Sequence, residues 1–139
     1  MEIQRNIGAD MDFWKVAMRP GKPVMAGKIG NTIVLGLPGN PSSAFVTAFL
    51  FLLPLIRYMA GSLSPLPEIF EAKADNALFP GGSRAEYVRG RVEGGSITAF
   101  ITRDSGLVSP LSHSNALIIR DVNAPEAPTG AIVQYHRLF

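Results

Sequence analysis

The segment that most constrains the fold is an apolar run that leads through a proline-containing turn into a helix. Residues Thr32–Leu37 form a continuous apolar run, which is typical of a strand buried on both faces of a sheet. Val24–Ala26 is also strand-like, and Gly30-Asn31 between the two runs is suited to a hairpin turn. A Pro-Gly-Asn-Pro turn at residues 38–41 follows. The first part of the chain is therefore expected to be strand, turn and helix.

One long helix is expected after this turn. Asn40 is a good N-cap, and Pro41 suits the first helical position. The helix should run to about Met59, with Gly61 as its C-terminal cap. Pro54 should kink this helix or end it early, because proline removes one backbone donor.

Five short strands are expected after a linker. The linker is Gly61–Pro67, where proline and glycine are dense. Gly94-Gly95 predicts a tight hairpin between two of the strands. The strand patterns occupy Ile69–Ala74, Glu86–Glu93, Ser96–Thr102, Ala116–Asp121 and Ala131–Arg137. We therefore predict an α/β unit over residues 1–62, followed by a small all-β barrel-like domain over residues 68–139.

Composition narrows the class of protein. Hydrophobic residues make up 47% of the 139 residues, which is enough for a buried core. The net charge of +2 weakly supports a nucleic-acid surface, although a local anion site needs only a few basic side chains. There are no cysteines and no apolar signal core near the first residue, which fits a cytoplasmic protein. The apolar stretch Ala44–Ile56 is shorter than the roughly 20 residues of a membrane span, so it predicts a buried core helix.

Two segments of the first half are candidates for anion binding. At the helix start, backbone N–H groups and the helix dipole favour an anion, and Ser42 and Ser43 add hydroxyl donors. Upstream, Lys15, Arg19 and Lys22 are three cations that could hold phosphates or another oxyanion. A structural turn and a solvated basic loop would explain the same residues. Trp14, next to Lys15, could stack on a planar ring or belong to the core.

The second half offers less specific signals. Arg89 and Arg91 would share one face of a strand, either as a basic patch or as an ordinary exposed face. Ser105–Asn115 is a loop dense in hydroxyl groups that could bind phosphate or simply turn the chain. His113 and His136 have no acidic pair at ligand spacing, which disfavours a histidine-based metal site. The sequence has no Walker loop and no dinucleotide-binding fingerprint.

Taken together and in this order, four segments resemble the molybdopterin molybdenumtransferase family, which includes the C-terminal domain of gephyrin. The segments are Phe13–Pro23, Gly36–Ala44, Arg89-Gly90 and Ser105–Asn115. The resemblance implies an enzyme that inserts molybdate into adenylylated molybdopterin with the help of magnesium. It also implies a dimeric protein of about three times this length, whose active cleft uses both subunits. The first half would then be the strand–turn–helix end of a molybdopterin-binding α/β domain.

The resemblance also implies roles for individual residues. Family members carry Lys or Arg at the place of Arg19, so the cation is kept. Gly106 replaces a side chain, often His, that follows the matching serine, which puts a role for this position in doubt. The implied catalytic residues are Lys15, Arg19 and Ser105, and the implied substrate-binding residues are Pro38, Gly39, Asn40, Pro41, Ser43 and Arg89.

The resemblance leaves part of the family's site unmatched. The family's acidic residues and its Gly-rich segment lie upstream of Met1, and no acidic residue here matches a magnesium ligand. We therefore expect a fragment, a split subunit or a truncated reading frame, which is inactive alone and partners the missing N-terminal part. Two alternatives remain open. One is a non-catalytic interaction or assembly module, and the other is a small anion- or nucleotide-binding protein unrelated to molybdenum.

Overall fold

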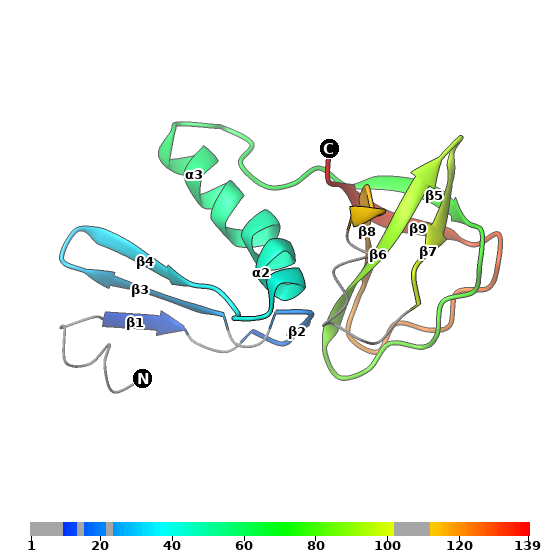
Figure 1. The fold of residues 1–139 in the computed structure, drawn as a ribbon, viewed down its shortest axis with the longest axis horizontal. Helices are drawn as coiled ribbons and strands as arrows, with labels where there is room; N and C mark the ends of the chain where they lie inside the picture. Colours follow the sequence, from blue (N-terminus) through cyan, green and yellow to red (C-terminus); the bar gives the residue numbers. More distant parts are fainter. Residues whose placement is uncertain (1–9, 14–15, 22–23, 102–111) are drawn as a thin grey trace.

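The computed structural model describes residues 10–13, 16–21, 24–101 and 112–139. A three-stranded sheet and one long helix lie on one side of the molecule, and a small barrel lies on the other (Figure 1). The start of the helix points towards the barrel, and a linker returns from the end of the helix to the first barrel strand (Figure 1). The α/β fragment followed by a small all-β barrel is thus confirmed.

The three-stranded sheet contains the expected hairpin. Strands β3 (Met25–Ile29) and β4 (Thr32–Gly36) pair antiparallel, and β1 (Asp10–Phe13) pairs with β3 on its other side. Gly30 makes the turn with a φ of 57°, in the left-handed region that glycine tolerates. Among the described residues β4 is an edge strand and Ile33 remains 39% exposed, so the apolar run is not buried on both faces here, as expected of a fragment with too few elements to cover it.

The helix runs without a break from Pro41 to Met59 as α2 (Pro41–Thr47), the π-helical η1 (Ala48–Leu52) and α3 (Leu53–Met59). Asn40 caps its start, since its side-chain oxygen accepts a hydrogen bond of 3.2 Å from the backbone N–H of Ser43. Pro54 does not end the helix. The wider π-helical turns lie just before this proline, where its ring and missing N–H disturb the ordinary α-helical pattern.

Gly61 caps the end of the helix as the sequence predicts. Its φ is +86°, and its N–H donates to the carbonyl of Tyr58 at 3.0 Å. The N–H of Ser62 donates to the carbonyl of Arg57 at 2.9 Å. This pair of bonds is the Schellman arrangement, which satisfies carbonyls that the last helical turn leaves open.

Five strands close into a ring in the second half, and each corresponds to a predicted strand. Gly94 and Gly95 form the predicted tight turn, with φ angles of 57° and 87°. Gly90 lies inside the barrel, where a Cβ atom would come within 2.8 Å of the Thr98 carbonyl oxygen. The ring runs β6 (Ala85–Glu93), β7 (Ser96–Ala99), β5 (Phe70–Ala74), β9 (Ile132–Arg137) and β8 (Ala116–Arg120), then back to β6.

A two-residue strand from the first half of the chain pairs with a barrel strand. Strand β2 (Met18–Arg19) pairs parallel with β6, so that Met18 lies opposite Ala85 and Arg19 opposite Glu86. Met18 also packs with Val46 of the helix and Leu117 of β8 in a small core between the two halves. Neither β1 nor β2 was predicted, because such short strands leave little periodic pattern.

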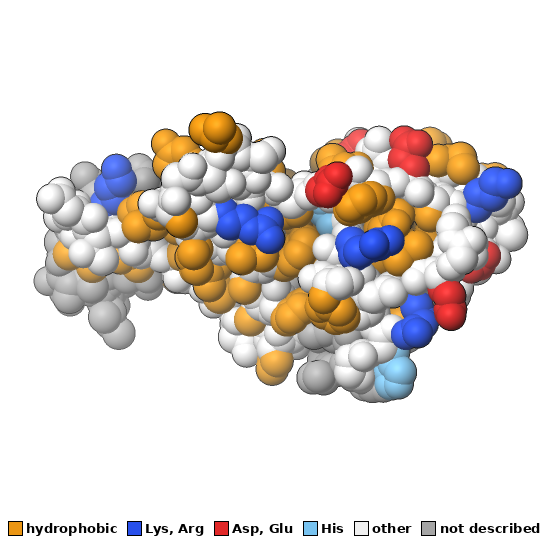
Figure 2. All heavy atoms as spheres, turned by 90° about the horizontal axis from the view of Figure 1, so that it is seen from above, with side chains coloured by type: hydrophobic (Ala, Val, Ile, Leu, Met, Phe, Trp, Pro, Cys, Tyr) orange, Lys and Arg blue, Asp and Glu red, His pale blue; other side chains and the backbone are white. Residues whose placement is uncertain are grey.

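The end of the helix is more exposed than a core helix would be. By length and composition alone, the helix Pro41–Met59 would pass as a membrane span, but a core helix of a soluble protein passes the same test. Val46 is fully buried, whereas Ile56 and Met59 are 53% and 67% exposed. The prediction of a buried core helix therefore holds near its start and is wrong at its end. Hydrophobic side chains gather over this part of the surface (Figure 2).

Candidate functional site

A cavity of about 120 Å³ lies where the helix start and β2 meet the barrel. Strand β6 changes partners there: β2 pairs with it as far as Glu86, and β7 pairs with it from Gly90 onward. The N–H of Phe100 still donates to the carbonyl of Arg89 at 2.8 Å, so Tyr87 and Val88 lie between the two partners on that side of β6. We call this space the arginine cavity. It is lined by Arg19, Pro20, Ser42, Leu78, Phe79, Pro80, Glu86, Tyr87, Val88, Arg89, Phe100, Ile101 and Arg120.

Arg89 connects the barrel side of the cavity to the helix side. Val88 and Val92 pack on the barrel core, so alternation along β6 places Arg89 on the outer face of the barrel. It is nevertheless only 7% exposed, because the helix start covers this face. Its Nη1 donates a hydrogen bond of 2.8 Å to Oγ of Ser42, which is 1% exposed. The bond fixes the direction of a cationic side chain in the cavity wall.

Arg19 reaches the same cavity from β2. Its Cα is paired with that of Glu86 across the sheet, and both residues line the cavity. Paired residues of neighbouring strands project from the same face, so these two side chains start from adjacent positions. Glu86 shares the face of Val88 by alternation along β6, so Arg19 starts from the face opposite to Arg89. Both arginines, seventy positions apart in the chain, nevertheless line the arginine cavity.

Arg120, at the end of β8, is a third arginine in the cavity wall that the sequence did not single out. It is 8% exposed, and its Nη2 donates to the carbonyl oxygens of Phe79 (3.1 Å) and Pro125. It is paired with Glu86 on the side opposite to Arg19. In the sequence, the one feature that could have indicated Arg120 is its place as a cation directly after the apolar run Ala116–Ile119. Ser42 was noted for its hydroxyl group, although Ser43 was the serine chosen for the site.

The remaining predicted residues of the helix start do not line the cavity. Asn40 serves as the helix cap, and Ser43 donates to it through its backbone N–H. Pro38 is buried, whereas Gly39 and Pro41 are exposed. Lys15, Lys22, Trp14 and Ser105 lie outside the described residues. Among the predicted site residues that the structure describes, Arg19 and Arg89 are the two that line this cavity.

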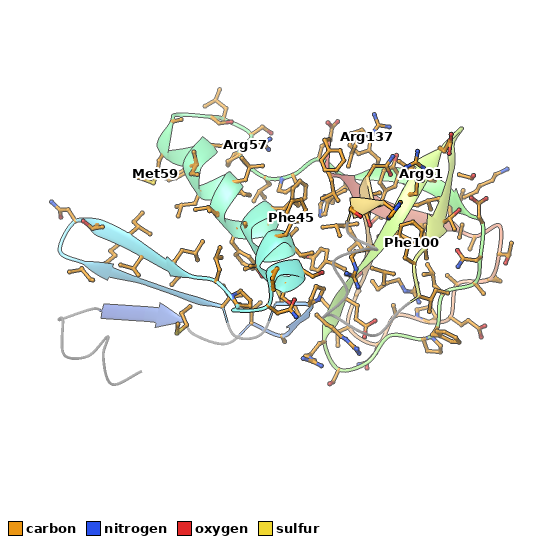
Figure 3. All side chains as sticks on the ribbon, in the orientation of Figure 1. Phe45, Arg57, Met59, Arg91, Phe100 and Arg137 are labelled. Atoms are coloured by element: carbon orange, nitrogen blue, oxygen red, sulfur yellow. The ribbon has the colours of Figure 1, made fainter. Side chains whose placement is uncertain are left out.

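Arg91 and Asn115 do not line the arginine cavity. Arg91 lies on the barrel surface (Figure 3), where its Nε is 3.6 Å from a carboxylate oxygen of Glu93. The side chain of Asn115 accepts from the backbone N–H of Val92 at 2.7 Å and donates to its carbonyl at 3.0 Å. Arg91 therefore belongs to an ordinary exposed strand face, and Asn115 extends the pairing of β6.

Tyr87 in the cavity wall has a raised pKa. Burial raises the pKa of its phenol above the ordinary value of 10.0, and the negative charge of Asp121 raises it further. Its ring stacks on His136 with a centroid distance of 6.2 Å and an interplanar angle of 18°. The Nδ1 of His136 lies 2.8 Å from the carbonyl oxygen of Glu68, and its ring centroid lies 6.1 Å from that of Phe49 in the helix, so this histidine lies in the contact between barrel and helix.

A bound metal does not fit the part of the chain that the structure describes. No group of three or more His, Cys, Asp or Glu side chains there is arranged to hold a metal ion. Magnesium requires oxygen ligands such as carboxylates, whereas the described wall of the arginine cavity carries three arginines and one glutamate. These described residues therefore do not form a magnesium site.

The fold and the cavity define a class of protein: an α/β strand–turn–helix unit whose helix start shares an arginine-lined cavity with a small barrel. Two family models match the chain. Residues 2–58 match a probable molybdopterin binding domain, and residues 71–138 match the MoeA C-terminal region (domain IV). The chain belongs to the molybdopterin molybdenumtransferase family.

Several named relatives show the extent of the similarity. The molybdopterin molybdenumtransferase of Nostoc sp. is 30% identical over 133 residues, which covers 85% of this chain and 29% of that protein. The protein of the same name from Haemophilus influenzae is 41% identical over 81 residues, which covers 58% and 20%. The Staphylococcus aureus (strain COL) protein of this name is 28% identical over 122 residues, covering 85% and 29%. The chain thus spans under a third of these relatives' length.

Solved structures share the fold. The molybdopterin biosynthesis MoeA protein from Pyrococcus horikoshii superposes with a TM-score of 0.80 at 22% identity, over 92% of this chain and 32% of that one. A molybdenum cofactor biosynthesis protein from Pyrococcus furiosus superposes with a TM-score of 0.73 at 21% identity, over 93% and 46%.

Proposed function

We propose that this chain supplies the C-terminal half of an active site that inserts molybdate into adenylylated molybdopterin during molybdenum cofactor biosynthesis. The observation that carries the proposal is the convergence of Arg19, Arg89 and Ser42 on one recessed cavity. The family membership supplies the reaction, and the cavity supplies a chemistry that suits it. Both substrates are anions, so the site must attract and orient negative charge.

Arg89 and Arg19 would contribute by binding anionic groups. A guanidinium group keeps its positive charge and presents donors in a planar fork that matches oxyanions. Arg89 is held in place by Ser42 before any ligand arrives, so little side-chain freedom is lost on binding. Fixed cations in a recessed site also stabilise negative charge that develops during reaction. Lys15 and Ser105 remain candidates for the same site on the basis of the family resemblance.

The rest of the family's length would supply what this chain lacks. The matched region is 29% of each of these relatives, so the part of each relative outside it is more than twice as long as the matched part. We propose that the complete protein holds magnesium on carboxylates of that additional part, works as a cytoplasmic homodimer and needs no membrane or nucleic acid. The exposed apolar end of the helix, including Ile56 and Met59, is a surface that the additional part could cover.

A reconstitution assay tests the proposal. The purified chain is mixed with adenylylated molybdopterin, molybdate and magnesium, with and without a separately produced N-terminal polypeptide from a relative. We expect molybdenum insertion above background only in the mixture that contains both polypeptides. An inactive mixture in which the two polypeptides do form a stable complex would favour a non-catalytic assembly module. Insertion by the chain alone would show that the additional part is not required.

A further inference from the structure

Arg120 is a buried cation whose known partners are neutral. It is 8% exposed, and its hydrogen bonds go to the carbonyl oxygens of Phe79 and Pro125. Within the described part of the chain, no carboxylate lies within ion-pair distance of its guanidinium. Glu86 is its neighbour across the strands, yet the two side chains form no ion pair.

Packing of the neighbouring loops does not explain why the charged side chain of Arg120 is buried. Buried charges in proteins are normally paired, because moving an uncompensated charge out of water is unfavourable. The two carbonyl groups satisfy N–H donors of Arg120 but do not balance its charge. Only Nη2 is used in these bonds, so the other nitrogens of the guanidinium fork remain available to a ligand.

The position of Arg120 indicates where that ligand would lie. Arg19, Glu86 and Arg120 form a row across three adjacent strands, and all three line the arginine cavity together with Arg89. The described lining residues include three arginines and one glutamate, so the wall favours a ligand with more than one negative charge. A cavity of about 120 Å³ exceeds the roughly 10–15 Å³ that one water requires, which leaves room for an oxyanion.

We propose that Arg120 is a further anion-binding residue of the arginine cavity and that it contacts a phosphoryl group together with Arg19, which starts from the same face of the sheet, while Arg89 holds a second anionic group of the same ligand. The ligand class is a phosphate ester or diphosphate that carries at least two negative charges. The inference deepens the proposed function, because adenylylated molybdopterin contains a diphosphate linkage. It requires only that this cavity binds such anions, so it can be tested without the insertion reaction.

Calorimetric titration of the full chain with inorganic pyrophosphate tests the inference. Arg120→Gln keeps a donor for one carbonyl but removes the charge, and it should weaken binding about tenfold, since a charge-assisted bond is worth about 1.4 kcal/mol or more. Arg120→Lys keeps the charge without the fork and should give an intermediate affinity. Arg91→Gln is the matched control on the exposed face of β6 and should leave the affinity unchanged. Equal affinities of Arg120→Gln and the unaltered chain would overturn the inference, as would an unaltered chain that does not bind pyrophosphate.

A second measurement covers the case in which Arg120→Gln fails to fold. In the unaltered chain, the Nε–H resonance of Arg120 should shift on addition of pyrophosphate, whereas that of Arg91 should not. An unmoved Arg120 resonance at saturating pyrophosphate contradicts the inference. The role of Arg120 and the proposed function can fail separately. If Arg120 binds pyrophosphate but the complete protein inserts no molybdenum, the proposed function is wrong and the role of Arg120 stands. If a complete protein carrying Arg120→Gln inserts molybdenum normally and binds pyrophosphate with normal affinity, the role of Arg120 is wrong and the proposed function stands.

Discussion

Nη1 of Arg89 donates a hydrogen bond of 2.8 Å to Oγ of Ser42, and this bond joins the outer face of the barrel to the first turn of the helix. Both side chains are buried, at 7% and 1% exposure. The same two residues line the arginine cavity, so the contact that connects the halves also shapes the candidate site.

Removing the hydroxyl group of Ser42 should therefore reduce stability. In Ser42→Ala the buried Arg89 donor loses this acceptor, and we expect the free energy of unfolding to fall by about 1–3 kcal/mol. Urea unfolding measures the change. Ser62→Ala, on the exposed linker, is the control and should change stability little. A loss below about 0.5 kcal/mol for Ser42→Ala would mean that the bond contributes little.

Tyr87 should make stability fall at alkaline pH. Its folded pKa is raised above 10.0 by burial and by Asp121, so the folded state keeps the phenol proton more tightly than the unfolded state does. This contribution is fully present below pH 10.0, the pKa of the unfolded group, and is lost as pH rises through the higher folded pKa. Absorbance of tyrosinate at 295 nm (roughly the usual wavelength) and unfolding at several pH values measure it.

Tyr87→Phe provides the matching test of that assignment. It removes the ionisable group but keeps the ring that stacks on His136. The stability of Tyr87→Phe should therefore decline less between pH 9 and 12 (roughly the range around the ordinary tyrosine pKa) than that of the unaltered chain. Parallel pH profiles for the two proteins would argue that other groups cause the alkaline loss.

The exposed end of the helix should promote self-association of the chain. Met59 and Phe45 project from the helix (Figure 3), and Ile56 and Met59 are more than half exposed. Ile56→Lys combined with Met59→Lys should shift the sedimentation of concentrated chain towards monomer, because charge disfavours association of an apolar surface. Leu63→Lys, on the fully exposed linker, is the control. If the double variant self-associates as strongly as the unaltered chain, the surface that mediates association lies elsewhere.

The sequence was informative wherever a local pattern determined the structure. Alternating strand patterns and the Gly94-Gly95 turn were sufficient for the barrel strands, and Asn40 and Gly61 for the two ends of the helix. The exposure of β4 was not predictable from its apolar run, because burial depends on which neighbours pair with a strand.

The candidate site depends more on contacts between distant residues, so less of it was predictable. Arg19 and Arg89 were selected through the family resemblance, and the structure brings them to one cavity. Arg120 was missed, because a cation at the end of a strand gains a role only when the barrel closes and β6 lies beside it. Ser42 rather than Ser43 lines the cavity and accepts from Arg89, whereas the backbone N–H of Ser43 takes part in the cap of Asn40. Neighbouring serines on a helix start point in different directions, which composition alone does not distinguish.

If the arginine cavity binds the anionic substrates of molybdenum insertion, reversing one charge in its wall must impair the reaction. The most direct measurement is the rate of molybdenum insertion by a complete protein that carries Arg19→Glu, with Arg19→Lys as the charge-preserving control. Arg19→Glu replaces a cation of the cavity wall by an anion that repels both substrates, so it should remove most of the activity. Arg19→Lys should retain a substantial part of it. Near-normal insertion by a folded Arg19→Glu protein would contradict the claim.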